Sequence, residues 1–492
     1  MGSRETGGTV LQWGSDILER ISLSSTAEKP SSYLLEHFPP LLADECLQGQ
    51  TEGVVKHVEA ALRRGHVPSH EIIPMPRGLD GYRPVVYADT TTRIAYAALV
   101  EAALPVLDPP SRSEANRWEF RNLGTDESKP GYVILSDIAS CYEYIAPAIL
   151  SDELFMRSDD FELVRHLLDL LQHLTTLERG IPQMLEPSDR LADLYLSRID
   201  RSLERSGLRW MRTADDYKVV VPSWEETAGA LELLDREVRN VGLILSAEKT
   251  RIVRAGVRAK ARSSSSPETD AEVEEGEEET SPIEALLEWH ESWRGRSRTV
   301  VMNIPGPPPT REIRRLSSAE DVTADLLADL VFAYPPHLEY VVGILARLVS
   351  TSDENDALAV EAFSKILEQS RPTSWNMLWL LEGASALLRT GRMSESVDAK
   401  AAAMKGLKDD KEVVRSQSAW FLARFHSLRL GDIQDLHLHA SYLTIPAVSA
   451  AATLAATRAD GEEGRKLKQL ASAIIAKQPL SEMAAAWAKA YV

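Results

Sequence analysis

Two adjacent aspartates are the first sign of chemistry in this chain. The stretch "MRTADDYKVVV", residues 211–221, sets Asp215 and Asp216 beside residues that favour strands. Aspartate is a poor strand residue and two neighbouring carboxylates repel, so a tight turn explains one of them and a metal ion explains both. The flanking stretches 208–213 and 217–222 predict two strands, with a turn near Ala214 that carries the acids at its tip. The alternative is a solvated acidic turn on a surface hairpin.

A third carboxylate ends an apolar run. In "GYVILSDIASCYEYI", residues 131–145, the apolar segment 132–135 predicts a buried strand that ends at Asp137. An aspartate in this place is also typical of a helix N-cap. Together with the acidic hairpin, however, it suits Mg²⁺, which takes carboxylate oxygens and substrate phosphates as ligands. Two such ions about 4 Å apart activate an attacking hydroxyl and stabilise a leaving pyrophosphate. Asp137, Asp215 and Asp216 are therefore the candidate catalytic residues.

A bent loop and an amphipathic helix separate the two carboxylate elements. In residues 179–207, Gly180 and Pro182 break the preceding helix, Ser188 is the expected N-cap of the next, and Gly207 ends it. The apolar residues of this helix repeat every four positions and predict one buried stripe: Leu191, Tyr195, Ile199 and Leu203.

In this order the segments resemble the palm of a reverse transcriptase. "DIASCYEYI" resembles its first palm motif, "GIPQMLEPSDRLADLYL" its Gly-Ile-Pro-Gln-Gly motif, and "RTADDY" its Tyr/Phe-x-Asp-Asp box. "GLILSAEKTRIV", residues 242–253, resembles the following Leu-x-x-x-x-Lys-Thr motif, and residues 72–94 are similar to the fingers segment. The resemblance covers roughly residues 30–256 and rests on five motifs in the right order. The fold class it implies is α+β, with right-hand polymerase fingers and palm.

The resemblance implies a set of metal ligands. Asp137 and Asp215 hold two Mg²⁺ ions, the backbone carbonyl of Ile138 completes one coordination shell, and Asp216 supports the other two acids.

It also implies five substrate-binding residues. Arg77 and Arg83 contact the triphosphate, with ordinary surface arginines as the alternative. Tyr142 lies under the sugar and rejects a 2′-hydroxyl, unless it is simply a packed core aromatic. Gln183 contacts the nucleotide or the template. Lys249 orients or protonates the pyrophosphate, with a solvated lysine at a strand edge as the alternative.

Two positions depart from the family pattern. Met184 stands where the family has glycine after Pro-Gln, and Thr213 stands where it has an aromatic beside the aspartate pair. Both departures weaken the expectation of ordinary templated copying. The sequence also lacks the additional motifs of retron enzymes and the cysteine-rich endonuclease domain of some intron-encoded enzymes.

The charge pattern places a linker in the middle of the chain. The net charge is −19, which argues against coating nucleic acid by bulk electrostatics, although a local basic groove remains compatible with it. The stretch "PETDAEVEEGEEET", residues 267–280, holds eight acids and no base. We expect residues 261–282 to be a disordered acidic linker, because they contain too few large apolar residues to form a core.

The residues after the linker predict an all-helical domain. After residue 318 the apolar residues recur at helical spacing in about ten segments joined by short loops. This pattern indicates a stack of helix pairs of the HEAT type, with a plain helical bundle as the alternative. The predicted domains are fingers and palm over 1–260, the linker over 261–282, and the HEAT-like domain over 283–492. Tryptophans and arginines in residues 288–302 either dock this domain or stack on single-stranded bases.

The combination of palm and helical tail resembles the prokaryotic abortive-infection and antiphage reverse transcriptases. It implies a magnesium-dependent DNA polymerase that takes dNTPs, makes single-stranded DNA and forms a homo-oligomer, with or without an RNA template. It also implies priming on a protein tyrosine, for which Tyr33, Tyr334, Tyr340, Tyr442 and Tyr491 are candidates outside the palm. A conventional templated reverse transcriptase with an RNA-binding tail and a non-catalytic assembly scaffold are the alternatives. With two distant cysteines, no signal peptide and no long apolar run, we expect a cytoplasmic protein without a membrane span.

Overall fold

A computed structural model of the chain provides the coordinates. It describes residues 10–28, 38–77, 81–104, 111–125, 131–175, 179–256, 322–349, 351–369, 373–388 and 397–491, and the isolated positions 286, 287, 289, 290 and 313.

The chain forms two compact units whose boundaries do not follow the sequence order. The first unit contains residues Met1–Leu35, Val54–His70 and Ala88–Ala261. The second contains Glu36–Gly53, Glu71–Tyr87 and Arg262–Val492. Two short segments near the N-terminus therefore pack with the C-terminal residues, a feature that the sequence pattern does not reveal.

The first unit is built around a four-stranded antiparallel sheet with the order β4-β5-β3-β6. Its strands are β3 (Tyr132–Asp137), β4 (Arg209–Thr213), β5 (Asp216–Val221) and β6 (Arg251–Arg254). The alternating burial of β5 leaves Tyr217, Val219 and Val221 on the buried face. The strands expected on both sides of the aspartate pair, and the strand expected to end at Asp137, are confirmed.

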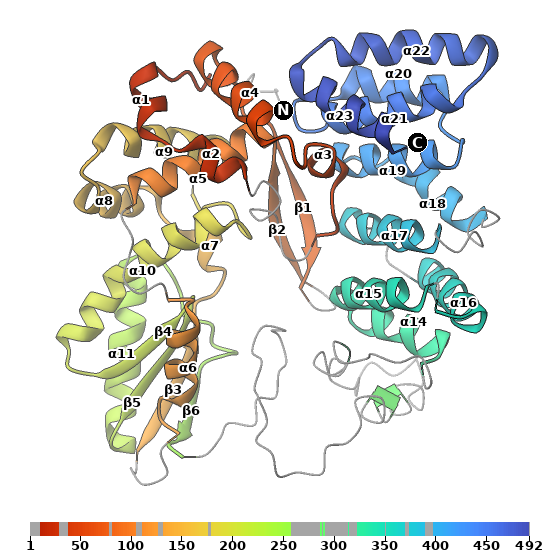
Figure 1. Ribbon diagram of the computed structural model, residues 1–492. Helices are drawn as coiled ribbons and strands as arrows, with labels where there is room; N and C mark the ends of the chain where they lie inside the picture. Colours follow the sequence, from red (N-terminus) through yellow and green to blue (C-terminus); the bar gives the residue numbers. More distant parts are fainter. Residues whose placement is uncertain are drawn as a thin grey trace, which may run out of the picture. The chain divides into compact units, whose positions relative to one another are not determined.

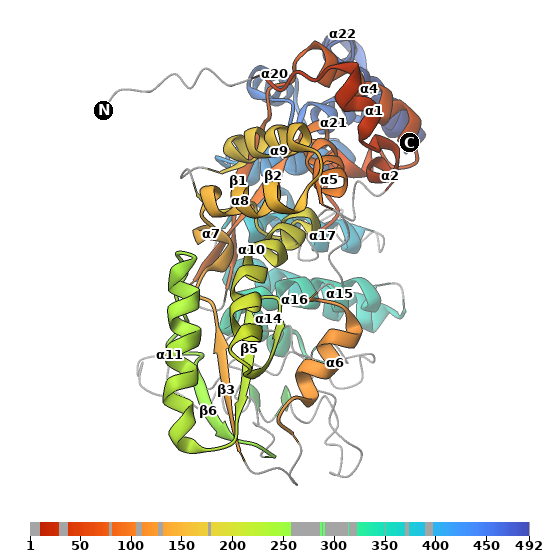
Figure 2. The same ribbon diagram turned by 90° about the vertical axis from the view of Figure 1, so that its left-hand side faces the viewer.

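Helices make up the rest of the first unit, some of them packed on the sheet and the others packed on one another. They are α1 (Ser15–Arg20), α2 (Leu23–Ala27), α4 (Thr51–Arg64), α5 (Thr90–Ala103), α6 (Glu114–Asn122), α7 (Cys141–Tyr144), α8 (Pro147–Arg157), α9 (Phe161–Leu174), α10 (Glu186–Arg205) and α11 (Trp224–Asn240). Helices α10 and α11 pack against the sheet, and Figure 2 shows α11 running alongside β3 and β5.

Helix α10 confirms the predicted apolar stripe and corrects its start. Leu191, Tyr195 and Leu203 are fully buried, and Gly207 follows the helix at φ +74°, the left-handed conformation that glycine favours. Ser188 is not the N-cap, because the helix begins two residues earlier and Leu185 takes that position. Pro187 suits the first turn, where no intrahelical donor is needed, and the Ser188 hydroxyl instead pairs with the Tyr96 hydroxyl at 2.8 Å.

The C-terminal part of the second unit is mostly helical. Its described helices are α14 (Ala324–Ala333), η2 (Pro335–His337), α15 (Leu338–Leu348), α16 (Asp353–Gln369), α17 (Ser374–Leu387), α18 (Val397–Gly406), α19 (Glu412–Arg424), α20 (Leu430–His439), α21 (Ile445–Arg458), α22 (Gly461–Ile475) and α23 (Pro479–Ala490). From α15 to α23 each odd-numbered helix packs on the next odd-numbered one, and α15, α17, α19 and α21 appear one above another in Figure 1. The expectation of a mainly helical C-terminal region is confirmed.

A β-hairpin and a short helix from the N-terminal third complete the second unit. They are β1 (His70–Pro76), β2 (Tyr82–Ala88) and α3 (Leu42–Glu45). The Glu71 carboxylate accepts hydrogen bonds from the backbone N–H groups of Glu412 at 2.6 Å and Val413 at 3.1 Å. It therefore caps the start of α19, which lacks a side-chain cap of its own.

A second anchor holds α3. The Gln417 side chain of α19 accepts from the backbone N–H of Leu42 at 3.0 Å and donates to the Pro40 carbonyl at 3.3 Å. The bond to Leu42 is buried, so Gln417 holds the start of α3 against α19.

Several predicted features lie outside the described residues. The acidic linker 261–282, most of the tryptophan and arginine stretch 288–302 and Tyr33 belong to them. Among the helices that the structure does describe, none has the length and apolarity needed to cross a membrane.

Candidate active site

Strand pairing brings the three predicted aspartates together. Asp137, the last residue of β3, is the register partner of Asp216, the first residue of β5. Asp215 lies in the turn between β4 and β5, and its carbonyl accepts the backbone N–H of Ile138 at 3.3 Å. The three carboxylates therefore meet at one end of the central strand pair, as the sequence predicted for a shared site.

A buried arginine fixes the turn that carries Asp215. The Arg212 guanidinium donates to the Asp193 carboxylate at 2.8 Å, to both oxygens of Asp200 and to the Ala214 carbonyl at 2.7 Å. The N–H of Ala214 donates to the Ser111 hydroxyl at 3.3 Å. Both backbone groups of the turn residue are thus held by side chains, and the turn is tied to helix α10.

Crowding of the acids changes their ionisation. Burial, together with Asp215 and Asp137, raises the pKa of Asp216 to about 7. Burial and the neighbouring Asp137 also raise the pKa of Asp215. The site therefore has excess negative charge that a proton or a metal cation would relieve.

Lys249 supplies one positive charge at this site. Its ammonium lies 3.1 Å from an Asp137 oxygen, and the backbone N–H of Ser246 donates to the Asp137 carbonyl at 2.7 Å. The segment that contains Lys249 is therefore attached to the end of β3 by both main-chain and side-chain contacts. The interpretation of Lys249 as a purely solvated lysine does not fit this contact.

The acids form an incomplete metal site by themselves. Among the described residues, no group of three His, Cys, Asp or Glu side chains is arranged to enclose a metal ion. The donors that do meet here are carboxylate oxygens and, at Ile138, the backbone of a buried residue that also bridges to Leu245. Oxygen donors at an open position suit Mg²⁺, which keeps water and substrate phosphates as further ligands.

Tyr142 is held in a polar network beside the carboxylates. It lies in α7, and its hydroxyl donates to the Asp189 carboxylate at the start of α10 and accepts from Arg112 at 2.6 Å. Arg112 also lies 3.2 Å from Asp189, and its charge favours the ionised form of Asp215. Burial and Asp189 raise the pKa of the Tyr142 phenol well above its usual value, so it stays protonated. Tyr142 is therefore a positioned polar residue and not a simple core aromatic.

The predicted glycine-proline loop packs on α7, the helix that contains Tyr142. Gly180 has φ +81°, and a β-carbon there would lie 2.8 Å from the Tyr142 carbonyl, so only glycine fits. The Ile181 N–H donates to the Tyr142 carbonyl at 2.9 Å, and the buried Gln183 amide donates to Glu143 at 3.2 Å. The loop is thus placed next to Tyr142, and Gln183 follows two residues later.

Met184 has a backbone conformation that glycine favours. Its φ of +63° lies in the left-handed region, which a residue with a side chain rarely adopts. Ser140 and Ala214 also have positive φ, at 48° and 52°. Of the described non-glycine residues, only these three and His426 do so, which means that three of the four lie in the segments that build this site.

The two predicted fingers arginines belong to the second unit. Arg77 is exposed just after β1, and Arg83 is half-buried in β2. Both lower the pKa of Tyr334, which burial raises, so the two cations lie within electrostatic reach of that phenol. Their assignment to a triphosphate stays a prediction.

Sequence reasoning missed six residues around the site. Ser111, Arg112 and Arg212 follow no recognisable pattern, Asp189 suited the first turn of a helix, and Asp193 and Asp200 drew no attention. One signal was available for the acids: all three fall on one face of α10 by helical spacing. That face meets Arg212 and Arg112.

The chain is similar to known proteins over part of its length. Residues 73–286 match the family described as reverse transcriptase (RNA-dependent DNA polymerase). No curated protein matches the chain. Among solved structures, one match is telomerase from Candida albicans in complex with a TWJ fragment of telomeric RNA, at 10% identity and a TM-score of 0.27. The match covers 75% of this chain and spans 66% of that one.

Proposed function

We propose that this chain, which contains a reverse transcriptase domain and is a reverse transcriptase-like polymerase, adds dNTPs to a 3′ or protein hydroxyl by two-metal catalysis at Asp137, Asp215 and Asp216. The observation that carries the proposal is the register pairing of Asp137 with Asp216, with Asp215 in the adjoining turn. Burial and the neighbouring acids raise the pKa values of Asp215 and Asp216, and such a crowded acid cluster is typical of a functional site.

Magnesium fits the donors that are present. Asp137 and Asp215 would hold the two ions, the Ile138 carbonyl would complete one shell, and Asp216 would support them. When bound, Mg²⁺ would supply Lewis-acid stabilisation of the attacking oxygen and of the pyrophosphate. The ammonium of Lys249, 3.1 Å from Asp137, already occupies part of this negative site as a cation. Lys249 would then turn to the departing pyrophosphate.

The network around Tyr142 would read the sugar. Its hydroxyl is fixed by Asp189 and Arg112, so the ring has one position instead of several rotamers. A ring held in this way leaves little room for a 2′-hydroxyl and would favour dNTPs over ribonucleotides. Gln183, held by Glu143 next to this loop, would contact the nucleotide or the template.

We also propose, from the resemblance alone, that the chain acts in prokaryotic antiphage defence, as a homo-oligomer with a HEAT-like helical domain. The packing of every second helix on the next supports a repeat architecture. Loss of phage protection in cells that express Asp215→Asn in place of the normal chain would support this role. Equal protection by that variant would favour the assembly scaffold.

Priming on a tyrosine is the riskiest part of the proposal. Of the candidate tyrosines, Tyr334 lies within electrostatic reach of Arg77 and Arg83, whose charges oppose the rise of its pKa that burial causes. Because its pKa still lies above the usual value, a base would have to remove the phenol proton, or a metal ion replace it, before the oxygen attacks an α-phosphate. We expect DNA that stays with the protein through denaturation in detergent, is released by proteinase, and is lost in Tyr334→Phe. Free DNA that requires an added RNA template would instead favour a conventional templated enzyme.

A magnesium-dependent incorporation assay, with and without added RNA, tests the central proposal. In Asp137→Asn and Asp215→Asn we expect at least about a 10³-fold loss of incorporation, because several kcal/mol of charge stabilisation disappear. Asp169→Asn, an exposed acid on α9, is the matched control and should keep full activity. Retained synthesis in both site variants would overturn the polymerase assignment, whereas an unchanged thermal midpoint would show that their folding is intact.

A further inference from the structure

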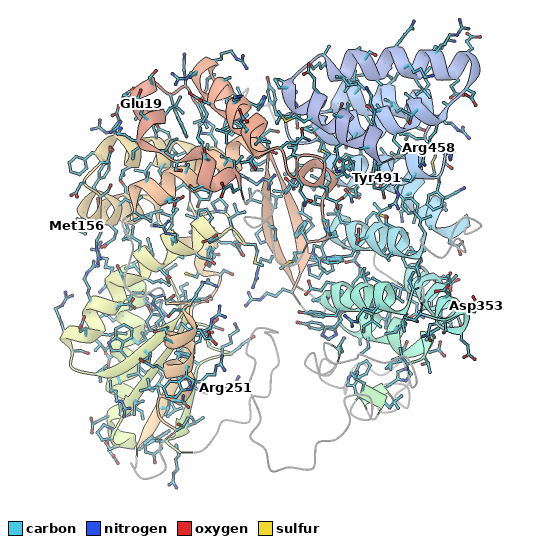
Figure 3. The ribbon with its side chains drawn as sticks, in the orientation of Figure 1. Glu19, Met156, Arg251, Asp353, Arg458 and Tyr491 are labelled. Carbon is cyan, nitrogen blue, oxygen red and sulfur yellow. The ribbon has the colours of Figure 1, made fainter. Side chains whose placement is uncertain are left out.

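An open groove lined by arginines lies on the first unit, between α8, α9 and α10. Its volume is about 850 Å³. It is lined by the cations Arg165, Arg198, Arg201 and Arg205, by the apolar residues Phe155, Met156 and Phe161, and by two acids, Asp152 and Glu153. Met156, at the end of α8, is labelled in Figure 3. A basic groove is unusual on a chain whose net charge is −19.

One of the four arginines, Arg201, has a structural role. Arg201 donates to both carboxylate oxygens of Glu153, at 2.8 and 2.9 Å, and Glu153 is fully buried. This pair joins α10 to α8 and would be costly to break. Arg165, Arg198 and Arg205 differ from it, because they are exposed and make no ion pair within the described part of the chain. Three cations in the groove are therefore available to a ligand.

The groove and the carboxylate site lie on opposite faces of α10. By helical spacing, Asp189, Asp193 and Asp200 share one face, and Arg198 and Arg205 point about half a turn away from them. The acidic face meets Arg212 and Arg112, whereas the basic face lines the groove. A ligand in the groove would consequently bind without touching Asp137, Asp215 or Asp216.

Exposed apolar side chains border the arginines. Met156 is 65% exposed and Phe161 is 55% exposed, and the Phe161 ring lies 5.6 Å from that of Phe155. Exposed aromatic rings beside cations are the elements with which proteins bind single strands, because bases stack on the rings while cations contact the backbone. The guanidinium group suits phosphate in particular, since its fixed donors can form two parallel hydrogen bonds.

We propose that this groove binds single-stranded nucleic acid through its phosphates, at a site separate from the carboxylates. Arg198 and Arg205 are seven residues apart on α10, about 10 Å along the helix axis, which corresponds to about three stacked nucleotides. The identity of the ligand rests on the proposed polymerase function, since a polymerase has a template or product strand to hold. An acidic peptide would match the charge but would leave Phe161 and Met156 unused.

Binding of a labelled oligonucleotide tests this inference. Fluorescence anisotropy would be measured with a fluorescein-labelled 12-nucleotide DNA and with RNA of the same sequence, in the absence of Mg²⁺ and dNTPs. In the double variant Arg198→Glu/Arg205→Glu we expect at least tenfold weaker binding and a smaller dependence on salt, because two phosphate contacts are lost. Phe161→Ala should weaken binding by about fivefold or more with little change in salt dependence.

The matched control is Arg236→Glu/Arg239→Glu on α11. Both arginines are exposed, and the change in net charge is the same, so non-specific repulsion is equal in the two proteins. Equal binding by the groove variant and the control would overturn the proposal. So would a poly-glutamate 12-mer that binds the unchanged protein more tightly than either oligonucleotide. The neutral pair Arg198→Gln/Arg205→Gln, checked by thermal midpoint, replaces the glutamate variant if that one fails to fold.

The two nucleic-acid arms separate a DNA product from an RNA template. Tighter DNA binding identifies the groove with the product, and tighter RNA binding identifies it with the template. Because no nucleotide is added, the result does not depend on catalysis. Loss of incorporation in Asp215→Asn with normal oligonucleotide binding confirms both ideas separately, and retained incorporation in that variant would remove the polymerase proposal without altering the measured binding.

Discussion

The carboxylate end of the β3–β5 pair and helix α21 are both buried, but they bury opposite kinds of groups. In α21 the residues 445–456 are buried without interruption and include no charge, and alanine dominates. At the end of β3 the buried or half-buried groups are charged, and two backbone positions have positive φ. Helix α21 therefore gains stability from close packing. The carboxylate end depends on a few charged contacts that oppose its own repulsion.

Of the substitutions in these two regions, replacement of Arg212 has the largest expected effect on the free energy of unfolding. Replacing Arg212 by Met removes the cation that pairs with Asp193 and Asp200 and leaves these two partly buried acids with only hydroxyl partners among the described residues, Ser111 and Tyr217. We expect the free energy of unfolding to fall by about 3–5 kcal/mol. Urea denaturation measures this change, and Arg209→Met, at an exposed position of β4, is the control. A loss below 1 kcal/mol would mean that the arginine is not the main support of the turn.

Ala450 tests the packing of α21. It is fully buried, and α21 packs tightly against α19 and α23, so Ala450→Leu has to displace neighbouring side chains. The free energy of unfolding should fall by about 1–3 kcal/mol. The same substitution at the exposed Ala473 of α22 should have almost no effect. Equal effects at both positions would show that α21 is more loosely packed than its burial indicates.

Ala214→Gly has the smallest expected effect on stability, and the direction of this effect shows whether the turn is strained. The φ of +52° at Ala214 is unfavourable for a residue with a β-carbon, so Ala214→Gly relieves strain that offsets the usual penalty of glycine. We expect stability to stay within about 1 kcal/mol of the unchanged protein or to rise slightly. Ala228→Gly, exposed inside α11, should lower it by about 1 kcal/mol. If Ala214→Gly is the more destabilising of the two, the turn is not strained.

The sequence predicted the parts of the site that depend on local pattern. Strand ends, the hairpin turn and the apolar stripe of α10 follow from spacing within about twenty residues. Asp137 could be grouped with Asp215 and Asp216 in advance because their carboxylates suit Mg²⁺ and because the order of the motifs resembles a reverse transcriptase palm. The contribution of Ser111 and Arg112 could not be foreseen, because it depends on the pairing of distant segments. Ser188 was assigned wrongly, since a good capping residue competes with Pro187, which fits the first turn of a helix.

The residue types also failed to predict the backbone conformation at some positions. Met184 weakened the expectation of templated copying, because the family pattern has glycine there, and its φ of +63° shows that the methionine takes a conformation that glycine favours. The residue type at a position does not reveal the backbone conformation that the surrounding residues impose. The placement of Glu71 with the helices of the second unit was likewise invisible, since its partners follow 341 and 342 residues later.

The contact between Glu71 and the start of α19 can form only late in translation, because its two partners lie far apart in the sequence. The N–H groups that Glu71 caps are made 341 residues after it, and the Gln417 side chain that binds Leu42 is made 375 residues after it. At about 5–20 residues per second, a ribosome needs roughly 17 to 75 s to cover these distances. During that interval the hairpin β1–β2 and helix α3 leave the ribosome without the surface on which they finally rest. The cell therefore has to protect these early segments until translation is almost complete.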